Sequence, residues 1–394
     1  MAPSRSQARG QGCDRGNPQR RGSATRGSAA ALLRLDPAEI RWFRRRLLRW
    51  YRKYARPWPW RASANSYHVW VAEVMLQQTR VEVVAKAFPR FLARFPSVAD
   101  LALAPLENVL AVWSGLGYYT RARNLHRAAQ WLWKHGYREF PREPSLARAL
   151  PGVGPYTVAA VLSIAYNQRL AAVDANVRRV LGRVTGNPSA TKNGKLAQAI
   201  AVALLDPHAP GDWNQALMEL GQRLCIPRTP QCPACPWQPR CATARSSVAL
   251  RIAAPRRRGP GKSPIELVAD LVFDTRGRIV VERGVFPYLR HLWVPVLHEA
   301  QASAAGLAPS RGQSLGTFRH AIGKRQFRVS VYLRKLSNQK ATRFLHDVPA
   351  PGERRLVTPK ELEHLGRSSL LLKSWQLWVR QLARGGVAFS EANQ

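Results

Sequence analysis

The sequence predicts a multidomain chain in which a long all-α region is followed by a small α+β domain. Three observations predict this organisation. From residue 36 to residue 242, apolar residues recur every three or four positions, as they do in amphipathic helices. From residue 265 to residue 385, stretches in which apolar and polar residues alternate predict half-buried strands. Between the two regions, residues 243–264 are rich in Arg, Pro and Gly, which is typical of a linker.

The charge of the chain indicates a polyanionic partner. The 394 residues include 62 Lys and Arg against 23 Asp and Glu, a formal net charge of +39. Such an excess favours nucleic acid as the partner. A membrane is disfavoured, because no run of about 18 apolar residues occurs and the Arg-rich helices carry no long apolar stripe for lipid.

The two ends of the chain, residues 1–35 and 386–394, are expected to be tails. The first is rich in Arg, Gly and Ser and holds one acidic residue, Asp14, so it is expected to be disordered. Its composition also suits an organelle transit peptide, although its Gly and Pro content disfavours an amphipathic helix. Clustered cysteines without a signal peptide indicate a reducing compartment, and we expect the cytoplasm of a bacterium, in association with the nucleoid.

Start signals for helices recur through the all-α region. Pro or a capping side chain stands at 36–37, 97, 100–101, 105–107, 144–145 and 174. Helical periodicity is clearest over 69–76, 101–113 and 196–205. We therefore expect one domain of about 200 residues that contains helices and turns only.

In the α+β domain, the spacing of apolar residues changes from every three or four positions to every second position, which predicts strands. Alternating stretches at 265–273 and 278–282 flank Asp274-Thr275-Arg276-Gly277, which predicts a hairpin. A third strand is predicted at 327–333, and helices at 359–364 and 369–382. No acidic residue occurs between Glu299 and Asp347, and this excludes a Mg²⁺-dependent nucleotide hydrolase, which needs a helix dense in Glu.

Four of the five cysteines lie close together after a helical stretch. Cys225, Cys232, Cys235 and Cys241 are separated by six, two and five residues, whereas Cys13 stands alone in the tail. Four thiolates at such spacings bind either Zn²⁺ or a [4Fe–4S] cluster. Zinc ribbons usually pair two Cys-x-x-Cys knuckles. Only one is present here, so the spacing favours an iron–sulfur cluster in a loop at 225–241.

A glycine-containing turn and two acidic residues are the other candidates for chemistry. Gly152 and Gly154 lie in a tight turn between helices, where backbone amides could approach a phosphate or simply join the helices. Glu73 is the only charged residue of an apolar helix. Burial would raise the pKa of its carboxyl, as a general acid requires, although a solvated Glu is the commoner case. Asp174 is placed to cap a helix, a role that is compatible with catalysis.

Four motifs in order carry a resemblance to a known family. They are Glu-Val-Met-Leu-Gln-Gln-Thr at 73–79, Trp-Ser-Gly-Leu-Gly-Tyr-Tyr at 113–119, the turn at 150–156 with Asp174, and the four cysteines. Through these motifs the chain resembles the MutY-type adenine DNA glycosylases of the endonuclease III superfamily. The resemblance runs nearly continuously from about Pro57 to Cys241. The resemblance implies a helix-hairpin-helix fold with one [4Fe–4S] cluster. It also implies a monomeric, monofunctional enzyme that excises adenine paired with 8-oxoguanine or guanine in double-stranded DNA.

The resemblance also assigns roles to residues of this chain. Glu73 would protonate N7 of adenine, and Asp174 would stabilise the oxocarbenium character of the sugar. Tyr156 and Asn176 would orient Asp174 and the sugar. The remaining positions correspond to the adenine pocket (Arg61, Gln215), the contact with the opposite base (Gln78, Thr79, Tyr118) and the hairpin (Gly152, Gly154).

The α+β domain resembles the Nudix-like module with which these glycosylases sense 8-oxoguanine. Phe318-Arg319-His320 stands where the family commonly has Phe-Ser-His, so Phe318 and His320 are candidate contacts, and Arg319 removes a hydroxyl that helps to discriminate 8-oxoguanine from guanine. A second departure is Ala175, where the family usually has Gly, so this position is expected to avoid positive φ.

Two other readings share several of these features. An iron–sulfur DNA-binding regulator would explain the charge, the hairpin and the cysteines, but not the joint presence of Glu73 and Asp174 in their motifs. A glycosylase for thymine or oxidised pyrimidines would share the scaffold. Gln77-Gln78-Thr79 and the attached α+β domain favour the adenine-specific enzyme.

Overall fold

The computed structural model describes residues 36–246, 263–299, 312–323, 325–348 and 351–383. The predicted tails, 1–35 and 386–394, and most of the predicted linker, 243–264, lie outside the described residues. The chain divides into two compact units: Met1–Lys53, Val173–Pro207 and Ala216–Ala254 form the first, and Tyr54–Ala172, His208–Gln215 and Pro255–Gln394 form the second. Among the described residues, no helix combines the length and the apolar character needed to cross a membrane.

The first unit is helical and contains the cysteine loop. Its elements are α2 (Pro37–Tyr54), α10 (Ala175–Val184), α11 (Ser189–Lys192), α12 (Gly194–Leu204), the C-terminal part of α13 (Pro210–Arg223), the short turns η2 (Cys232–Ala234) and η3 (Gln238–Arg240), and α14 (Ala242–Arg245). Trp237 is buried within the loop, and its indole nitrogen donates to the carbonyl of Phe43 at 2.9 Å. This hydrogen bond ties the loop to α2.

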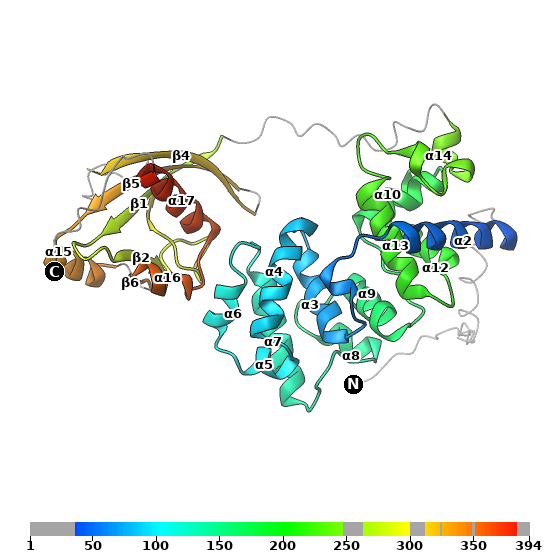
Figure 1. Ribbon diagram of the computed structural model, residues 1–394, viewed down its shortest axis with the longest axis horizontal. Helices are drawn as coiled ribbons and strands as arrows, with labels where there is room; N and C mark the ends of the chain where they lie inside the picture. The colour runs from blue at the N-terminus through cyan, green and yellow to red at the C-terminus, as the bar shows by residue number, and fades with distance from the viewer. Residues whose placement is uncertain (1–35, 247–262, 300–311, 324, 349–350, 384–394) are drawn as a thin grey trace, which may run out of the picture. The chain divides into compact units, whose positions relative to one another are not determined.

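The helical part of the second unit is built around one apolar helix (Figure 1). Its elements are η1 (Pro59–Arg61), α3 (Ser66–Leu76), α4 (Val81–Arg94), α5 (Val98–Leu103), α6 (Leu106–Val112), α7 (Thr120–Lys134), α8 (Pro144–Ala149) and α9 (Pro155–Tyr166). Nearly all of α3 is buried, from Ser66 to Met75. A helix that is apolar on all sides can be stable only inside such a core.

The apolar periodicity over 101–113 belongs to two helices, and the start expected at 105–107 is confirmed by α6. Pro105 separates α5 from α6, because a proline disfavours helical backbone in the residue before it. The start expected at 100–101 is wrong. Ser97 caps α5, and Asp100 completes a capping box from inside the helix. The starts expected at 36–37, 144–145 and Asp174 are confirmed by α2, α8 and α10.

The C-terminal part of the second unit is an α+β domain with a six-stranded sheet. Its strands are β1 (Ile265–Phe273), β2 (Ile279–Arg283), β3 (Val296–Glu299), β4 (Gln313–Ile322), β5 (Arg325–Lys335) and β6 (Glu353–Val357). The order is β4-β5-β1-β2-β6, with β3 also paired to β1; only the β1–β5 pair is parallel. The predicted hairpin is present, with Asp274 accepting from the amides of Arg276 and Arg278 and Gly277 at φ +72°.

Helices cover both faces of this sheet. On one face, α17 (Ser369–Ala383) packs against β1, β4 and β5, and α16 (Pro359–Glu363) contacts β6; the helices are labelled in Figure 1. On the other face, α15 (Asn338–His346) covers Val272, Val280 and Val296. Helices at 359–364 and 369–382 were predicted; α15, β3, β4 and β6 were not.

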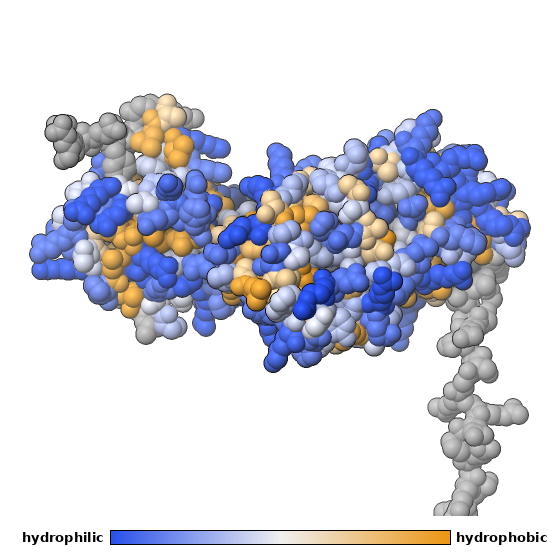
Figure 2. All heavy atoms as spheres, turned by 60° about the horizontal axis from the view of Figure 1, so that its bottom comes forward, coloured by the Kyte–Doolittle hydropathy of each residue, from blue (hydrophilic) through white to orange (hydrophobic). Residues whose placement is uncertain are grey.

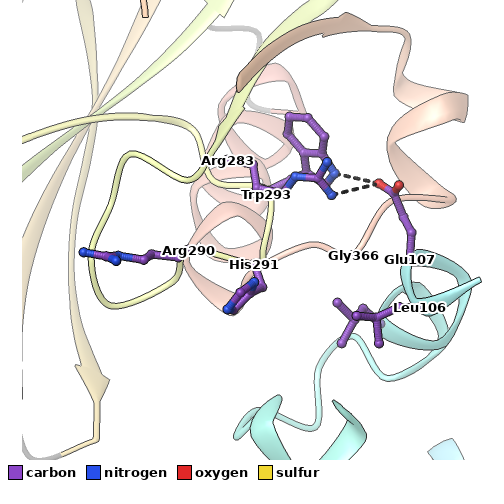
Figure 3. A pocket seen from close by; sticks show the side chains of 8 residues that line it. Leu106, Glu107, Arg283, Arg290, His291, Trp293 and Gly366 are labelled. Atoms are coloured by element: carbon purple, nitrogen blue, oxygen red, sulfur yellow. Dashed lines mark hydrogen bonds and ion pairs between the residues drawn. The ribbon is translucent and has the colours of Figure 1, made fainter. Parts of the chain in front are cut away.

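The α+β domain contacts the helices of its own unit through Glu107 of α6 (Figure 3). The indole nitrogen of Trp293 donates to this carboxylate at 2.8 Å, and Arg283 lies 3.8 Å from it. Nearby, the hydroxyls of Ser114 and Tyr119 donate to the carbonyl of Arg367. The domain therefore touches the loop at 113–119, which carries one of the sequence motifs.

Candidate active site

Glu73 is a buried carboxyl paired with a phenol. It lies on α3 with only 5% of its surface exposed. The hydroxyl of Tyr156, the second residue of α9, donates to Glu73 Oε2 at 2.9 Å. The alternative of a solvated Glu is therefore wrong, and two residues that are 83 positions apart meet in one site.

A helix-turn-helix brings Tyr156 to this position. Between α8 and α9, the amide of Val153 donates to the carbonyl of Leu150, and Gly152 adopts a φ of +76°. A Cβ on Gly152 would lie 2.7 Å from that of Asn124, so both the backbone and the packing require glycine. Gly154 caps α9 and Pro155 opens it, which leaves the first amides of α9 without partners inside the helix.

Asp174 and Asn176 form a second polar pair, in the first unit. Asp174 caps α10, where its Oδ1 accepts from the amide of Val177 at 2.7 Å and its Oδ2 accepts from Asn176 at 2.9 Å. The amide oxygen of Asn176 in turn accepts from Arg179 at 3.0 Å. Ala175 opens α10 and does not have positive φ, as its side chain requires. The carboxylate is thus oriented from both of its oxygens.

The two residues expected at the adenine pocket are half-buried. Arg61 ends η1 and donates to the carbonyl of Arg56 at 2.9 Å. Gln215 lies on α13, one turn after the start of the helix.

Gln78 and Tyr118 share a backbone conformation that side chains rarely adopt. Their φ angles are +58° and +47°, both in the left-handed region, and both side chains are exposed, Tyr118 by 50%. Non-glycine residues in this region tend to occur where function holds them. Thr79, beside Gln78, donates to the carbonyl of Leu116. Residues 77–79 and 116–118 therefore lie side by side, with Gln78 and Tyr118 exposed; we call these two segments the ridge.

Arg121, which the sequence did not single out, lies beneath this ridge. The guanidinium is buried and donates to the carbonyls of Val74, Met75 and Gln77 at the end of α3. It also donates to Thr79 Oγ1 and to the carbonyls of Leu116 and Gly117. Burial lowers its pKa to about 10, so the group stays charged at neutral pH. One side chain thus links the helix of Glu73 to the loop of Tyr118.

Replacing Arg121 by Met should lower the free energy of unfolding by about 2–4 kcal/mol, because several buried carbonyls lose their charged donor. Urea denaturation of the purified protein measures this. Arg123→Met is the matched control, since within the described residues this side chain on the same helix makes one hydrogen bond, to Thr120, and its loss should cost less than about 1 kcal/mol. Equal losses in the two variants would contradict a special role for Arg121.

A cavity of about 450 Å³ lies beside the ridge, between the helices and the α+β domain. Tyr118 and Arg123 line it from one side, and His320 and Ser369 from the other. The Ser369 hydroxyl lies 3.4 Å from His320 Nε2. Burial, with help from Lys373, lowers the pKa of His320 to about 4, so its ring is neutral at neutral pH. We call this space the ridge cavity.

The other two residues of the Phe-Arg-His motif lie outside the lining of the ridge cavity. Phe318 is half-buried next to His320, with ring centroids 6.2 Å apart, and the Lys373 ammonium lies over it. Arg319 alternates with them along β4 and is exposed. Arg319 therefore does not line the ridge cavity, whereas Ser369 does.

The four clustered cysteines line one pocket of the first unit. Cys225 follows α13. Cys232 begins η2 and Cys235 caps its end, and Cys241 caps the end of η3. Burial raises the pKa of the Cys235 thiol to about 12, and the neighbouring cysteines add to this shift. Within the described residues, no three Cys, His, Asp or Glu side chains converge as they do around a single metal ion. The donor set of four thiols facing one space nevertheless fits a soft metal group.

A second arginine that the sequence did not single out organises this loop. Arg183 of α10 is 4% exposed and donates to the carbonyls of Ile226 and Pro227 at 2.6 Å each. It also lies 3.4 Å from Cys225 Sγ, while its own carbonyl accepts from Thr243. The loop is thus held by a charged group that faces the thiols.

The helical region is similar to a known family. Residues 71–204 match the model of the "HhH-GPD superfamily base excision DNA repair protein". Adenine DNA glycosylase of Homo sapiens is 43% identical over 218 residues, which cover 52% of this chain and 40% of that protein. The enzyme of Schizosaccharomyces pombe is 40% identical over 236 residues, which cover 54% of this chain and 51% of that protein.

The chain thus spans about half the length of such relatives, or less. Among solved structures, a thermostable thymine-DNA glycosylase aligns with a TM-score of 0.48 and 27% identity, covering 52% of this chain and 96% of that one. The sequence matches show what the helical region is similar to: residues 71–204 resemble the HhH-GPD superfamily of base excision DNA repair proteins, and a stretch of about 220 residues is similar to the adenine DNA glycosylases.

Proposed function

We propose that this protein is an adenine DNA glycosylase of base excision repair, which acts on adenine opposite 8-oxoguanine or guanine and leaves the DNA strand intact. The observation that carries the proposal is the buried Glu73 carboxyl with Tyr156 bonded to it at the start of the hairpin helix, inside a region homologous to such enzymes. Release of free adenine from a mispaired duplex tests it. Binding to the duplex without release would favour the DNA-binding regulator instead.

Glu73 is suited to protonate the departing base. Adenine leaves poorly as an anion and well as a neutral molecule, so a proton donor at N7 lowers the barrier to breaking the glycosidic bond. The apolar surroundings of Glu73 favour the neutral acid, which is the form that can donate. The phenol of Tyr156 fixes the position of the Glu73 carboxyl by donating to its Oε2.

Asp174 is suited to stabilise the sugar. As the base departs, the deoxyribose gains oxocarbenium character, and an oriented carboxylate lowers the energy of that cation. The bonds from Asn176 and from the amide of Val177 hold the carboxylate before the substrate arrives. The hairpin at 150–156 would hold the backbone through a phosphate at the N-terminal end of α9, which keeps the extruded nucleotide in place.

The strained ridge and the ridge cavity are suited to the opposite strand. Extruding adenine leaves a gap in the duplex, and exposed side chains such as Gln78 and Tyr118 would fill it. The base opposite would then face the ridge cavity, where His320 and Ser369 offer hydrogen-bonding groups. In this reading the α+β domain is a Nudix-like recognition module that compares 8-oxoguanine with guanine.

Ser369→Ala should reduce the preference for 8-oxoguanine over guanine by about 5–10-fold, the effect of losing one hydrogen bond to the base. Single-turnover excision from duplexes with adenine opposite each base measures the ratio. Arg319→Ala is the comparison, because this exposed side chain should change affinity for both duplexes alike. An unchanged ratio in Ser369→Ala would remove this hydroxyl from recognition.

The four thiols are suited to hold a [4Fe–4S] cluster. Their single short knuckle and their common pocket support it, with Arg183 opposing the negative charge of the thiolates. When bound, the cluster would fix the fold of a basic loop. The residues of the two acidic pairs would carry out the chemistry.

The purified protein is therefore expected to be brown, with about four irons per chain and little zinc. Cys232→Ser should lower iron content, thermal stability and DNA affinity together, because the loop loses its cross-link. Metal analysis and thermal unfolding measure the first two. A colourless protein with zinc and full activity would contradict this assignment.

A further inference from the structure

Helix α2 presents a stripe of arginines opposite to its buried face. The buried residues of α2 are Phe43, Leu47, Leu48, Trp50 and Tyr51. At about 100° per residue, the exposed Arg41, Arg45, Arg49 and Arg52 fall within an arc of about 80° on the other side. We call these four residues the α2 stripe. Figure 2 shows that hydrophilic side chains cover much of the surface presented in that view.

The stripe differs from the other arginines of the same helix. Arg44 donates to the carbonyls of Ala203 and Leu204 at the end of α12, and Arg46 donates to the carbonyl of Pro236. By contrast, Arg41 and Arg45 show no ion pair or side-chain hydrogen bond within the described part of the chain, and neither does Arg49. Like charges one turn apart destabilise a helix, so the stripe works against the stability of α2 unless an anion neutralises it.

We propose that the α2 stripe binds the phosphate backbone of duplex DNA, in a contact that does not depend on a lesion. From Arg41 to Arg52 the helix rises about 16 Å, along which one DNA strand carries about five phosphates. Guanidinium groups match phosphate geometry with two parallel hydrogen bonds. A membrane surface fits less well, because the apolar face of α2 is buried in its own unit and none is left for lipid.

This inference rests on the charge of α2 and does not require base excision. The stripe adds a sequence-independent contact, which would lengthen the time the protein stays on undamaged DNA while it searches. It also predicts that part of the DNA affinity can be removed without touching either acidic pair.

Removing three charges of the stripe tests the proposal in the full-length protein. The variant Arg41→Gln/Arg45→Gln/Arg49→Gln should lower affinity for a lesion-free duplex at least ~10-fold at 100 mM salt and reduce the slope of log K against log salt by about three. Fluorescence anisotropy between 50 and 300 mM salt measures both. A control with the same loss of charge, Lys340→Gln/Arg343→Gln/Lys360→Gln, changes exposed residues of α15 and α16 and should leave the slope nearly unchanged.

Two further measurements separate this proposal from others. The triple Arg→Lys variant keeps the charge and should keep the slope, which distinguishes lost contacts from a misfolded α2. Single-turnover release of adenine at saturating enzyme should stay within about twofold in the Gln variant.

If even the unmodified protein releases no adenine, the excision proposal fails. The slope of log K against log salt then still shows whether the α2 stripe binds duplex DNA. A slope unchanged in the Gln variant overturns the proposal, and so does stripe-dependent binding to phosphatidylserine vesicles with no such effect on duplex DNA.

Discussion

Glu73→Gln is expected to bind mispaired duplex normally and to release adenine about 10²–10⁴-fold more slowly than the unmodified protein. The amide has the shape of the acid and can still accept from Tyr156, which donates to Glu73 at 2.9 Å. It cannot give a proton to N7, so the base must leave as an anion. Single-turnover release from an adenine:8-oxoguanine duplex measures the rate, and anisotropy measures the binding.

Two variants show whether this loss is specific to the proton. Glu82→Gln makes the same change on the exposed face of α4 and should leave the rate unchanged. Tyr156→Phe keeps the acid and removes only its phenol partner, so its rate should fall less than that of Glu73→Gln. A Glu73→Gln protein that releases adenine at the normal rate would exclude Glu73 as the general acid.

Periodicity and turn chemistry predicted the architecture of the chain well. The strand at 265–273 and the Asp274–Gly277 turn follow from local sequence, and the structure has both. The edge strands β3, β4 and β6 were not predicted. In β4, polar and apolar residues do not alternate regularly, and the strand contains Gly316. The sequence pattern that predicts a strand is therefore weak there. The pairing of β4 with β5, which begins at Ile322 and Arg325, stabilises the strand.

For the candidate site too, the sequence predicted the features that depend on neighbouring residues and missed those that depend on packing between distant segments. Its acidic residues stood out because Glu73 is the only charge in an apolar helix and Asp174 precedes a helix start. The burial of Glu73 could not be predicted, because it depends on packing by the rest of the unit. Arg121 and Arg183 were missed for the same reason. Arginine is common in this sequence, and only the fold shows which of its 62 basic residues bind several buried carbonyls.

The unmodified protein is expected to release adenine without cutting the strand. A strand-cutting glycosylase needs an amine that attacks the sugar and forms an imine with loss of water, and a phenol cannot do so. Tyr156 occupies the hairpin position where relatives that cut the strand carry lysine, and no lysine lies between Lys134 and Lys192. The abasic product should stay intact until it is heated in alkali. Prompt nicking at the rate of adenine release would reveal a catalytic amine elsewhere in the fold.

Tyr156→Lys should introduce the missing amine, and Glu73 should decide how reactive it is. A lysine in place of Tyr156 would face the Glu73 carboxyl, and an ion pair between the two would ionise both groups and so hold the new lysine in its protonated, unreactive form. On a duplex that already contains an abasic site, borohydride should therefore trap Tyr156→Lys weakly and Glu73→Gln/Tyr156→Lys several-fold more strongly. The abasic substrate makes the comparison independent of base release. Equal trapping by the single and double variants would show that the charge of Glu73 does not reach position 156.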